Sequence, residues 1–383
     1  MRVLINAFSA RRGGGQTYLL NLFDGLPMDS DAEIILLAPE SLRLPEERRN
    51  VTRLAVSLPV ENPVTRAIWE KVELPRLLRE LRVDILFCPG GIIGARTPID
   101  CKTVTAFRNM IPFDLTQRRK YPLWYPRIRN WILHRLMLRS MMQADLVIFV
   151  SEYARNLIEI IADSPLKATV VIPHGIDQRF RITDGTKVAR PGWLPEEGYF
   201  LYVSILDVYK GQVEVVRGFA KWKRRRHTRV KLILAGPENP QYGRRVRAEI
   251  ERLGLIGDVI VAGSIPYQAL PAVYQHAIVN IFASECENCP NILLEALAAG
   301  RPVVVSDRQP MPEFGGDAVM YFDPTAPDDL AEKLALIVDD PDRMTELSKS
   351  ARERSFQFDA GRAAAQTWDA IAKLHQGGCQ SAR

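Results

Sequence analysis

The chain has 383 residues, of which 47% are apolar and 25% charged, with 51 Lys and Arg against 45 Asp and Glu. This length fits two globular domains, and no run approaches the roughly 20 apolar residues that span a bilayer. A net charge of +6 is too weak for a nucleic-acid binder, and five scattered cysteines argue against a disulfide scaffold. The N-terminus lacks the features of a secretion signal. We therefore expect a cytoplasmic protein with no nucleic-acid partner.

The first half of the sequence alternates short apolar runs with helical segments. Apolar runs bounded by turn residues predict strands at 2–8, 32–38, 83–89, 144–151 and 168–173. Amphipathic segments at 17–26, 66–81 and 152–161 predict helices between them. This alternation is typical of a parallel sheet with helices on both faces.

A polar segment rich in proline and glycine, 181–198, then predicts a linker. After it, strands are predicted at 199–204, 230–236, 258–263, 279–284, 302–307 and 318–323. Helices are predicted at 211–226, 241–254, 267–276 and 291–299, and helices dominate the rest of the chain. The pattern indicates an α/β fold of two doubly wound domains that face each other across a cleft.

The stretch "SECENCPNILLEALAAG" (284–300) holds two glutamates, Glu287 and Glu295, with seven residues between them. A strand ends at Ser284 and a helix begins near Asn291, after Pro290. Backbone N–H groups at the start of this helix suit an anion such as a diphosphate, while the two carboxylates suit sugar and ribose hydroxyls. Two solvated acids at a helix start would give the same spacing, so the spacing alone leaves both interpretations open.

Several segments in the same order resemble the family 4 glycosyltransferases. The segment 284–307 resembles the E-x7-E signature of that family, and the match extends across nearly the whole chain. The other similar segments are "GGGQTYLLNL" (13–22), "VVIPHGIDQRF" (170–180), "YVSILDVYKGQVEVVRGF" (202–219) and the loop and strand at 258–284. The resemblance implies the GT-B fold, with an acceptor-binding domain over 1–185 and a donor-binding domain over 186–358. It also implies that a C-terminal helix, 359–376, crosses back to the first domain.

The resemblance also implies roles for residues of the second domain. Glu295 would hold the ribose, Glu287 would contact the donor sugar close to the reacting carbon, and Lys210 would bind the diphosphate and stabilise charge on the leaving group. The alternative for Lys210 is a solvated lysine at a helix start. The remaining residues expected at the donor are Ser284, Asn288, Cys289, Asn291, Ile292 and Ile265.

In the first domain, glycines after the first strand predict a loop that approaches a phosphate or a sugar. Gly13, Gly14, Gly15 and Gln16 form this loop, although a plain turn would have the same sequence. Arg108 stands where many members of the family carry a histidine. An arginine cannot act as a base, but it can bind a phosphate or a carboxylate. Arg108 is therefore either a substrate-binding residue or a structural ion-pair partner.

A second departure from the family affects the diphosphate. Members often carry Gly-Arg before the lysine, whereas this chain has Ser204 and Ile205. Another basic residue or more backbone donors must then replace the missing cation.

Metal and cysteine chemistry find no support in the sequence. The histidines form no metal-binding pair, and no D-x-D stands at a strand end in a credible site, so we predict no catalytic metal and no cofactor beyond the donor substrate. Cys286 and Cys289 lack a second pair of ligands and are expected to be packing residues. Glu285 lies outside the seven-residue spacing and is expected to have no role in the site.

The segment 118–142 interleaves basic and aromatic residues. It either lies on the inner face of an anionic membrane, where a lipid-linked acceptor would be found, or packs on the first domain with its arginines in solvent.

Together with the resemblance, the sequence predicts a metal-independent glycosyltransferase, and the resemblance implies that the transfer retains the anomeric configuration. It would move a sugar from a nucleotide-diphosphate donor to a hydroxyl of a glycan or lipid-linked acceptor, in the biosynthesis of a cell-surface polysaccharide or glycoconjugate. Two alternatives remain. One is a phosphorylase or nucleotide-sugar epimerase on the same fold, and the other is a catalytically weak partner subunit that binds nucleotide or glycan.

Overall fold

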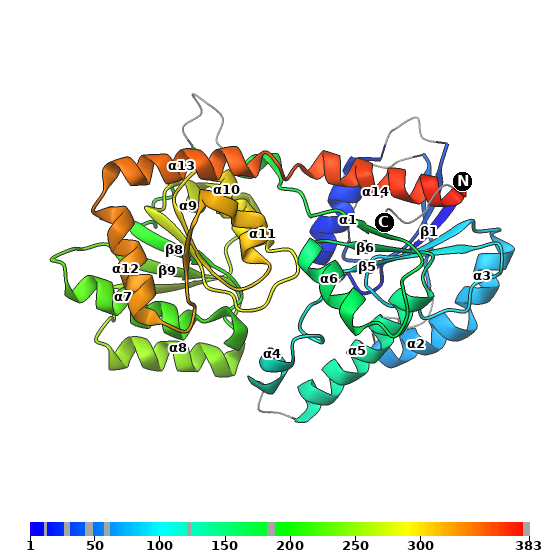
Figure 1. Cartoon of the computed structure of the whole chain (residues 1–383), viewed down its shortest axis with the longest axis horizontal. Helices are drawn as coiled ribbons and strands as arrows, with labels where there is room; N and C mark the ends of the chain where they lie inside the picture. The colour runs from blue at the N-terminus through cyan, green and yellow to red at the C-terminus, as the bar shows by residue number, and fades with distance from the viewer. Residues whose placement is uncertain are drawn as a thin grey trace. The chain divides into compact units, whose positions relative to one another are not determined.

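The computed structural model describes residues 1–10, 14–26, 31–42, 49–56, 62–120, 124–181 and 188–377. The chain divides into two compact units. Unit 1 comprises Met1–Phe113, Trp124–Gly175 and Ala360–Arg383, and unit 2 comprises Asp114–Leu123 and Ile176–Asp359. Each unit is built around its own parallel sheet (Figure 1).

The described residues of unit 1 form a seven-stranded sheet in the order β3-β2-β1-β4-β5-β6-β7, with every neighbouring pair parallel. The strands are β1 (Arg2–Asn6), β2 (Glu33–Leu37), β3 (Val51–Arg53), β4 (Ile85–Cys88), β5 (Lys102–Phe107), β6 (Leu146–Phe149) and β7 (Thr169–Val171). The order runs outward from β1 in both directions, so the sheet is doubly wound, as predicted.

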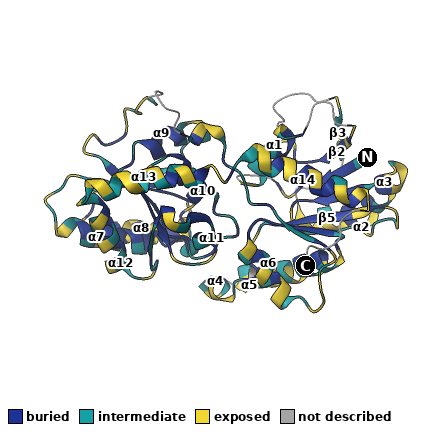
Figure 2. Ribbon diagram, turned by 45° about the horizontal axis from the view of Figure 1, so that its top comes forward, coloured by how far each residue is buried: buried dark blue, intermediate teal, exposed yellow. Residues whose placement is uncertain are grey.

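Both faces of this sheet are buried. Val3 and Ile5 of β1 pack into one apolar cluster with Trp368, whereas Leu4 points to the other face and packs with Trp69. The central strands β1, β4, β5 and β6 are correspondingly the most buried parts of the unit, and the helices expose their outer faces (Figure 2). Burial on both faces explains why these strands are continuous apolar runs in the sequence.

The helices of unit 1 include one from the end of the chain. They are α1 (Gly14–Asp24), α2 (Pro63–Val72), α3 (Leu74–Glu80), α5 (Trp124–Gln143), α6 (Glu152–Ile161) and α14 (Ala360–His375). The Trp368 indole of α14 donates to the Leu22 carbonyl of α1 over 2.8 Å. A Cβ atom on Gly25 would lie 2.3 Å from the Ala364 Cβ atom, so glycine permits the close approach of these segments.

The described residues of unit 2 form a six-stranded sheet in the order β10-β9-β8-β11-β12-β13, again with parallel neighbours. Its strands are β8 (Tyr199–Val203), β9 (Lys231–Ala235), β10 (Val259–Gly263), β11 (Val279–Phe282), β12 (Val303–Ser306) and β13 (Met320–Phe322). The order reverses between β8 and β11. Ligands of doubly wound sheets bind at the carboxyl ends of the strands at such a reversal, which places the loops after β8 and β11 at the expected site.

Unit 2 contains both short and long helices. The α-helices are α4 (Leu115–Lys120), α7 (Gln212–Arg224), α8 (Pro240–Arg252), α9 (Leu270–Gln275), α10 (Asn291–Ala298), α11 (Met311–Gly315), α12 (Pro327–Val338) and α13 (Pro341–Ser355). Four 3-10 turns are η1 (Gln178–Phe180), η2 (Val208–Lys210), η3 (Tyr267–Ala269) and η4 (Gly316–Ala318). Helix α10 begins at Asn291, as predicted.

The boundary between the units differs from the one predicted at residue 185. The segments 114–123 and 176–181 belong to unit 2, and residues 182–187 of the predicted linker lie outside the described residues. The reason is packing: Phe180 is fully buried in the core of unit 2, and the Ile176 N–H donates to the Phe358 carbonyl over 3.1 Å. Strands β3 and β5 were not predicted.

Candidate functional site

Lys210 is placed by the turn that follows β8. The Asp207 side chain caps η2 by accepting from the Val208 N–H over 2.7 Å, and the Tyr202 hydroxyl donates to the Lys210 carbonyl over 2.6 Å. Gly211 then adopts a left-handed conformation with φ of 66°, which an L side chain would strain. This turn delivers the Lys210 side chain to the carboxyl edge of the sheet, where it is only 4% exposed.

The Lys210 ammonium forms an ion pair with the Glu287 carboxylate. Its Nζ also lies 4.9 Å from the ring centroid of Tyr209 and 5.2 Å from that of Phe282. Two aromatic faces and one carboxylate therefore surround a buried cation. Removing one charge of such a pair is costly because the other is left buried without compensation.

The loop from Ser284 to Pro290 and the start of α10 carry most of the predicted donor-binding residues. Ser284 and Asn288 are buried, and Ile292 packs partly on the core of unit 2. The Asn291 N–H donates to the Cys289 carbonyl over 3.0 Å, which removes one of the backbone donors that the sequence assigned to a diphosphate. Ile265, in the loop after β10, also packs against the core.

Glu295 lies one turn into α10 and contacts two tyrosines that the sequence did not single out. The Tyr274 hydroxyl donates to Glu295 Oε2 over 3.2 Å, and the Tyr267 hydroxyl also hydrogen-bonds this carboxyl group. The residue as a whole is half-buried, but its carboxyl group is enclosed. Burial raises its pKa to about 8, and the nearby Asp177 charge acts in the same direction.

This pKa predicts a pH dependence of stability. Between about pH 4.5, the ordinary glutamate value, and about pH 8, the folded state holds a proton that the unfolded state has released, so the free energy of unfolding falls as the pH rises through this window. Glutamine has no carboxyl group to titrate, so in Glu295→Gln the free energy of unfolding does not fall for this reason. Relative to the wild type, this variant should therefore gain about 3 kcal/mol of stability between pH 5 and pH 8 in urea denaturation. Glu332→Gln, on the exposed face of α12, is the control, and parallel pH curves for wild type and Glu295→Gln would contradict the prediction.

Two further residues border this carboxyl group. Arg179 donates to Asp177 over 3.0 Å, and its guanidinium carbon lies 5.1 Å from the ring centroid of Tyr267. Both residues lie within the segment "VVIPHGIDQRF", but only the folded chain brings them to the tyrosine. A side chain's contact with a distant loop leaves no periodic signal in the sequence.

The predicted first-domain residues occupy a separate cluster in unit 1. The Arg108 guanidinium carbon lies 4.4 Å from the ring centroid of Tyr18, and the Tyr18 and His174 centroids are 5.5 Å apart. A Cβ atom on Gly15 would lie 3.5 Å from an Arg108 nitrogen, so the glycine loop and the arginine are neighbours. Tyr18 and His174 were not predicted.

Three other residues were predicted in the glycine loop of unit 1. Gly14 is the exposed first residue of α1. The Gln16 side chain donates to the Ser41 hydroxyl over 3.3 Å. Gly13 lies outside the described residues.

The two cysteines of the site loop are free thiols, and Cys286 is buried. Burial raises the pKa of Cys286, with the Asp114 charge acting in the same direction. Among the residues that the structure describes, no three His, Cys, Asp or Glu side chains are grouped as a metal site would require.

Known proteins identify both halves of the chain. The sequence profile described as Glycosyltransferase Family 4 matches residues 12–180, and the profile described as Glycosyl transferases group 1 matches residues 186–354. The chain belongs to the family 4 glycosyltransferases. The recognition made from the E-x7-E segment is therefore confirmed.

Solved structures show the same fold for this glycosyltransferase. Sucrose-phosphate synthase from Thermosynechococcus elongatus superposes with a TM-score of 0.77 at 17% identity, over 98% of this chain and 99% of that chain. Anabaena HepE, solved in complex with UDP-glucose, superposes with a TM-score of 0.73 at 17% identity, over 98% and 100%. The GT-B fold, with two Rossmann-like domains, is thereby confirmed.

Among curated sequences, this glycosyltransferase is similar to O-antigen chain mannosyltransferase B of Escherichia coli. The two are 24% identical over 226 residues, which is 58% of this chain and 58% of that protein. The match thus spans little more than half of the relative.

Proposed function

We propose that this glycosyltransferase transfers a sugar from a nucleotide-diphosphate donor to a hydroxyl group of a glycan or lipid-linked acceptor, with retention and without a metal. The observation that carries the proposal is the buried Lys210–Glu287 pair at the strand-order reversal of unit 2, followed by α10 with Glu295. Cation, helix start and carboxylate are what a diphosphate, a sugar and a ribose require. The similarity to an O-antigen mannosyltransferase supports a role in the biosynthesis of a cell-surface polysaccharide or glycoconjugate.

In the proposed mechanism, the donor replaces internal bonds of the site. The diphosphate takes the Lys210 ammonium from Glu287, and the released Glu287 carboxylate accepts from donor-sugar hydroxyls. The ribose hydroxyls donate to Glu295, which Tyr267 and Tyr274 hold in place. These exchanges are made by groups already positioned by the fold, so little reorganisation is needed at the moment of reaction.

The transfer step itself needs no protein base. The acceptor oxygen bonds to the anomeric carbon from the side of the leaving group as the bond from that carbon to the β-phosphate oxygen breaks. The acceptor proton moves to a β-phosphate oxygen, and the nucleoside diphosphate departs. Lys210 stabilises the negative charge that develops on the departing diphosphate.

The proposed function is tested by nucleotide release in the presence of EDTA. A panel of nucleotide sugars is incubated with the protein, with and without glycan and lipid-linked acceptors, and the free nucleoside diphosphate is measured. We expect acceptor-dependent release from one donor. Donor binding without turnover across the panel would instead favour a catalytically weak partner subunit, the alternative that Ile205 and Arg108 keep open.

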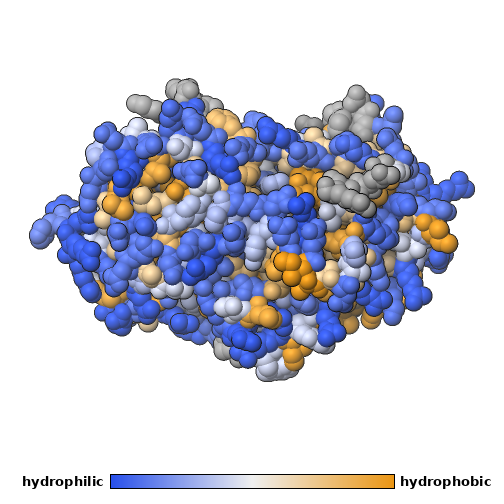
Figure 3. All heavy atoms as spheres, viewed as in Figure 1, coloured by the Kyte–Doolittle hydropathy of each residue, from blue (hydrophilic) through white to orange (hydrophobic). Residues whose placement is uncertain are grey.

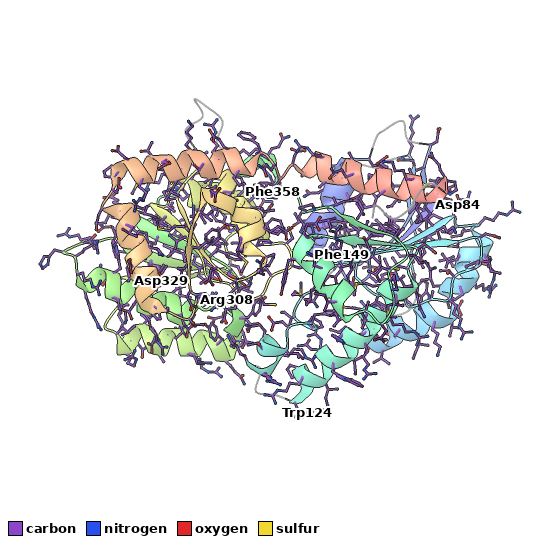
Figure 4. All side chains as sticks on the ribbon, in the orientation of Figure 1. Asp84, Trp124, Phe149, Arg308, Asp329 and Phe358 are labelled. Carbon is purple, nitrogen blue, oxygen red and sulfur yellow. The ribbon has the colours of Figure 1, made fainter. Side chains whose placement is uncertain are left out.

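We further propose that helix α5 brings the enzyme to an anionic membrane surface. Its exposed apolar residues recur on one face of the helix and are Trp124, Ile128, Trp131, Ile132 and Leu136. Trp124 is 72% exposed at the outer end of α5, away from the strand that carries Phe149 (Figure 4). Apolar atoms are also visible among hydrophilic ones at the lower edge of Figure 3.

The charge around this face matches anionic lipid. Helix α5, Trp124–Gln143, contains no Asp or Glu and four arginines. Among the described residues, no helix is both long and apolar enough to cross a bilayer. Tryptophan and isoleucine side chains that are exposed beside arginines favour the interfacial region, where burial of apolar area and attraction to anionic headgroups add.

Vesicle binding tests this part of the proposal. Wild type should float with vesicles that contain phosphatidylglycerol, and Ile128→Asp should bind them about tenfold more weakly because a charge enters the apolar face. Ile160→Asp, on α6 and 82% exposed in the wild type, is the matched control and should bind normally. Equal binding by Ile128→Asp and Ile160→Asp would show that α5 does not bind the membrane.

A further inference from the structure

Helix α4 packs on the loops of the candidate donor site. The segment Asp114–Leu123 belongs to unit 2. The chain on either side of it, up to Phe113 and from Trp124 to Gly175, belongs to unit 1. Within unit 2, α4 contacts η2, the turn that carries Lys210. A short helix has little stability of its own, so side-chain contacts must hold it there.

Three contacts join α4 to the loop after β11. The Lys120 ammonium lies 2.5 Å from Glu285 Oε1, and the Gln117 amide donates to Glu285 Oε2 over 3.4 Å. The Cys286 thiol hydrogen-bonds Asp114, whose other contact caps α4 by accepting from the Gln117 N–H over 2.9 Å. Gln117 is buried by this packing. Glu285, expected from the sequence to have no role, is the residue on which Lys120 and Gln117 converge.

Glu285 also connects the two loops that carry the candidate catalytic pair. Its backbone N–H donates to the Tyr209 carbonyl over 2.8 Å. Tyr209 immediately precedes Lys210, and Glu285 lies two residues before Glu287. One residue therefore fixes the separation of the loops through its backbone and anchors α4 through its side chain.

We propose that Glu285 is a positioning residue for the Lys210–Glu287 pair, and that α4 clamps it in place through Lys120 and Gln117. The proposal rests on the proposed function, because it assumes that Lys210 and Glu287 act on the donor. The Lys120 and Glu285 side chains are 31% and 14% exposed, and a pair of this kind contributes little to global stability. Its effect is local, on the geometry in which the catalytic pair is held.

A charge swap tests the positioning role. Lys120→Glu and Glu285→Lys each place two like charges together, so each should lower kcat about tenfold. The affinity for nucleoside diphosphate, measured without acceptor, should fall less than kcat does, because the ribose-binding groups on α10 are not displaced. The double variant restores an opposite-charge pair and should recover most of the lost kcat. Lys221→Glu, which reverses one charge of the exposed Lys221–Asp328 pair, is the matched control and should keep full activity.

A second measurement does not depend on activity. Trypsin cleaves after Arg118 and Arg119, inside α4, only when this helix opens, so the cleavage rate reports how firmly the helix is held. Glu285→Gln keeps both sites and should be cleaved there about threefold to tenfold faster than wild type, with an unchanged melting temperature.

The two measurements separate the failure of each proposal. Unchanged cleavage in Glu285→Gln would overturn the clamp. Faster cleavage with undiminished kcat in the charge-reversal variants would overturn the positioning role, as would a double variant no better than either single one. Faster cleavage in a protein that turns over no donor would leave the clamp standing and overturn the proposed function.

Discussion

Lys210→Ala should lower the rate of sugar transfer about a thousandfold, because the departing diphosphate would lose its buried cation. Lys210 is 4% exposed and flanked by two aromatic rings, so water cannot readily take over its charge. The chemical step is measured by single-turnover transfer at saturating donor. Lys221→Ala, which removes an exposed lysine on α7, is the control and should transfer at the wild-type rate.

Loss of folding must be separated from loss of chemistry in this variant. Lys210→Ala leaves Glu287 buried without its partner, which destabilises the protein. The double variant Lys210→Met with Glu287→Gln removes both charges and should melt close to the wild type while remaining inactive. A double variant that is folded and transfers sugar at more than about a tenth of the wild-type rate would remove the pair from the mechanism.

Glu295→Ala should weaken the binding of nucleoside diphosphate about a hundredfold, because two hydrogen bonds from the ribose to an ionisable group are lost. Isothermal titration with a panel of nucleoside diphosphates measures the affinity. Tyr274→Phe, which removes the 3.2 Å bond to Glu295 and keeps the ring, should cost only a few-fold. Unchanged affinity in Glu295→Ala would show that the ribose binds elsewhere.

The sequence predicted the parts of the fold that leave a periodic apolar signal. Strands such as β1 and β4 are buried on both faces and are continuous apolar runs. Strand β5 is also central and buried, but it carries Thr103 and Thr105. Their hydroxyls bond to Asp145 Oδ2 over 3.0 Å and to the Cys88 carbonyl over 3.2 Å, so polar residues are tolerated inside the sheet and hide the strand in the sequence. Strand β3 has three residues at a sheet edge, too few for a pattern.

The candidate site was predictable where its residues are neighbours in the chain. Glu287, Glu295 and the start of α10 lie within one short segment, and the resemblance to a family located Lys210. The tyrosines at Glu295 and the anchoring of Glu285 by Lys120 depend on contacts between segments far apart in the sequence. Single residues in such contacts have no local pattern, so only the folded chain shows them.

One departure from the family removes a positively charged residue that would bind the diphosphate. Ile205 stands in place of an arginine, is 39% exposed and offers no charge. Its carbonyl accepts from the Gln212 side chain over 2.9 Å, which ties this turn to the start of α7. Among the described residues of unit 2, we therefore assign Lys210 as the cation that binds the diphosphate.

A crystal structure with the nucleoside diphosphate that binds tightest would show which groups hold the donor. We predict that the diphosphate contacts the Lys210 ammonium and the start of α10, that the ribose hydroxyls bond to Glu295, and that the Lys210–Glu287 ion pair is broken. A nucleotide bound away from α10, or bound there with the ion pair intact, would show that this assignment of the donor site is wrong.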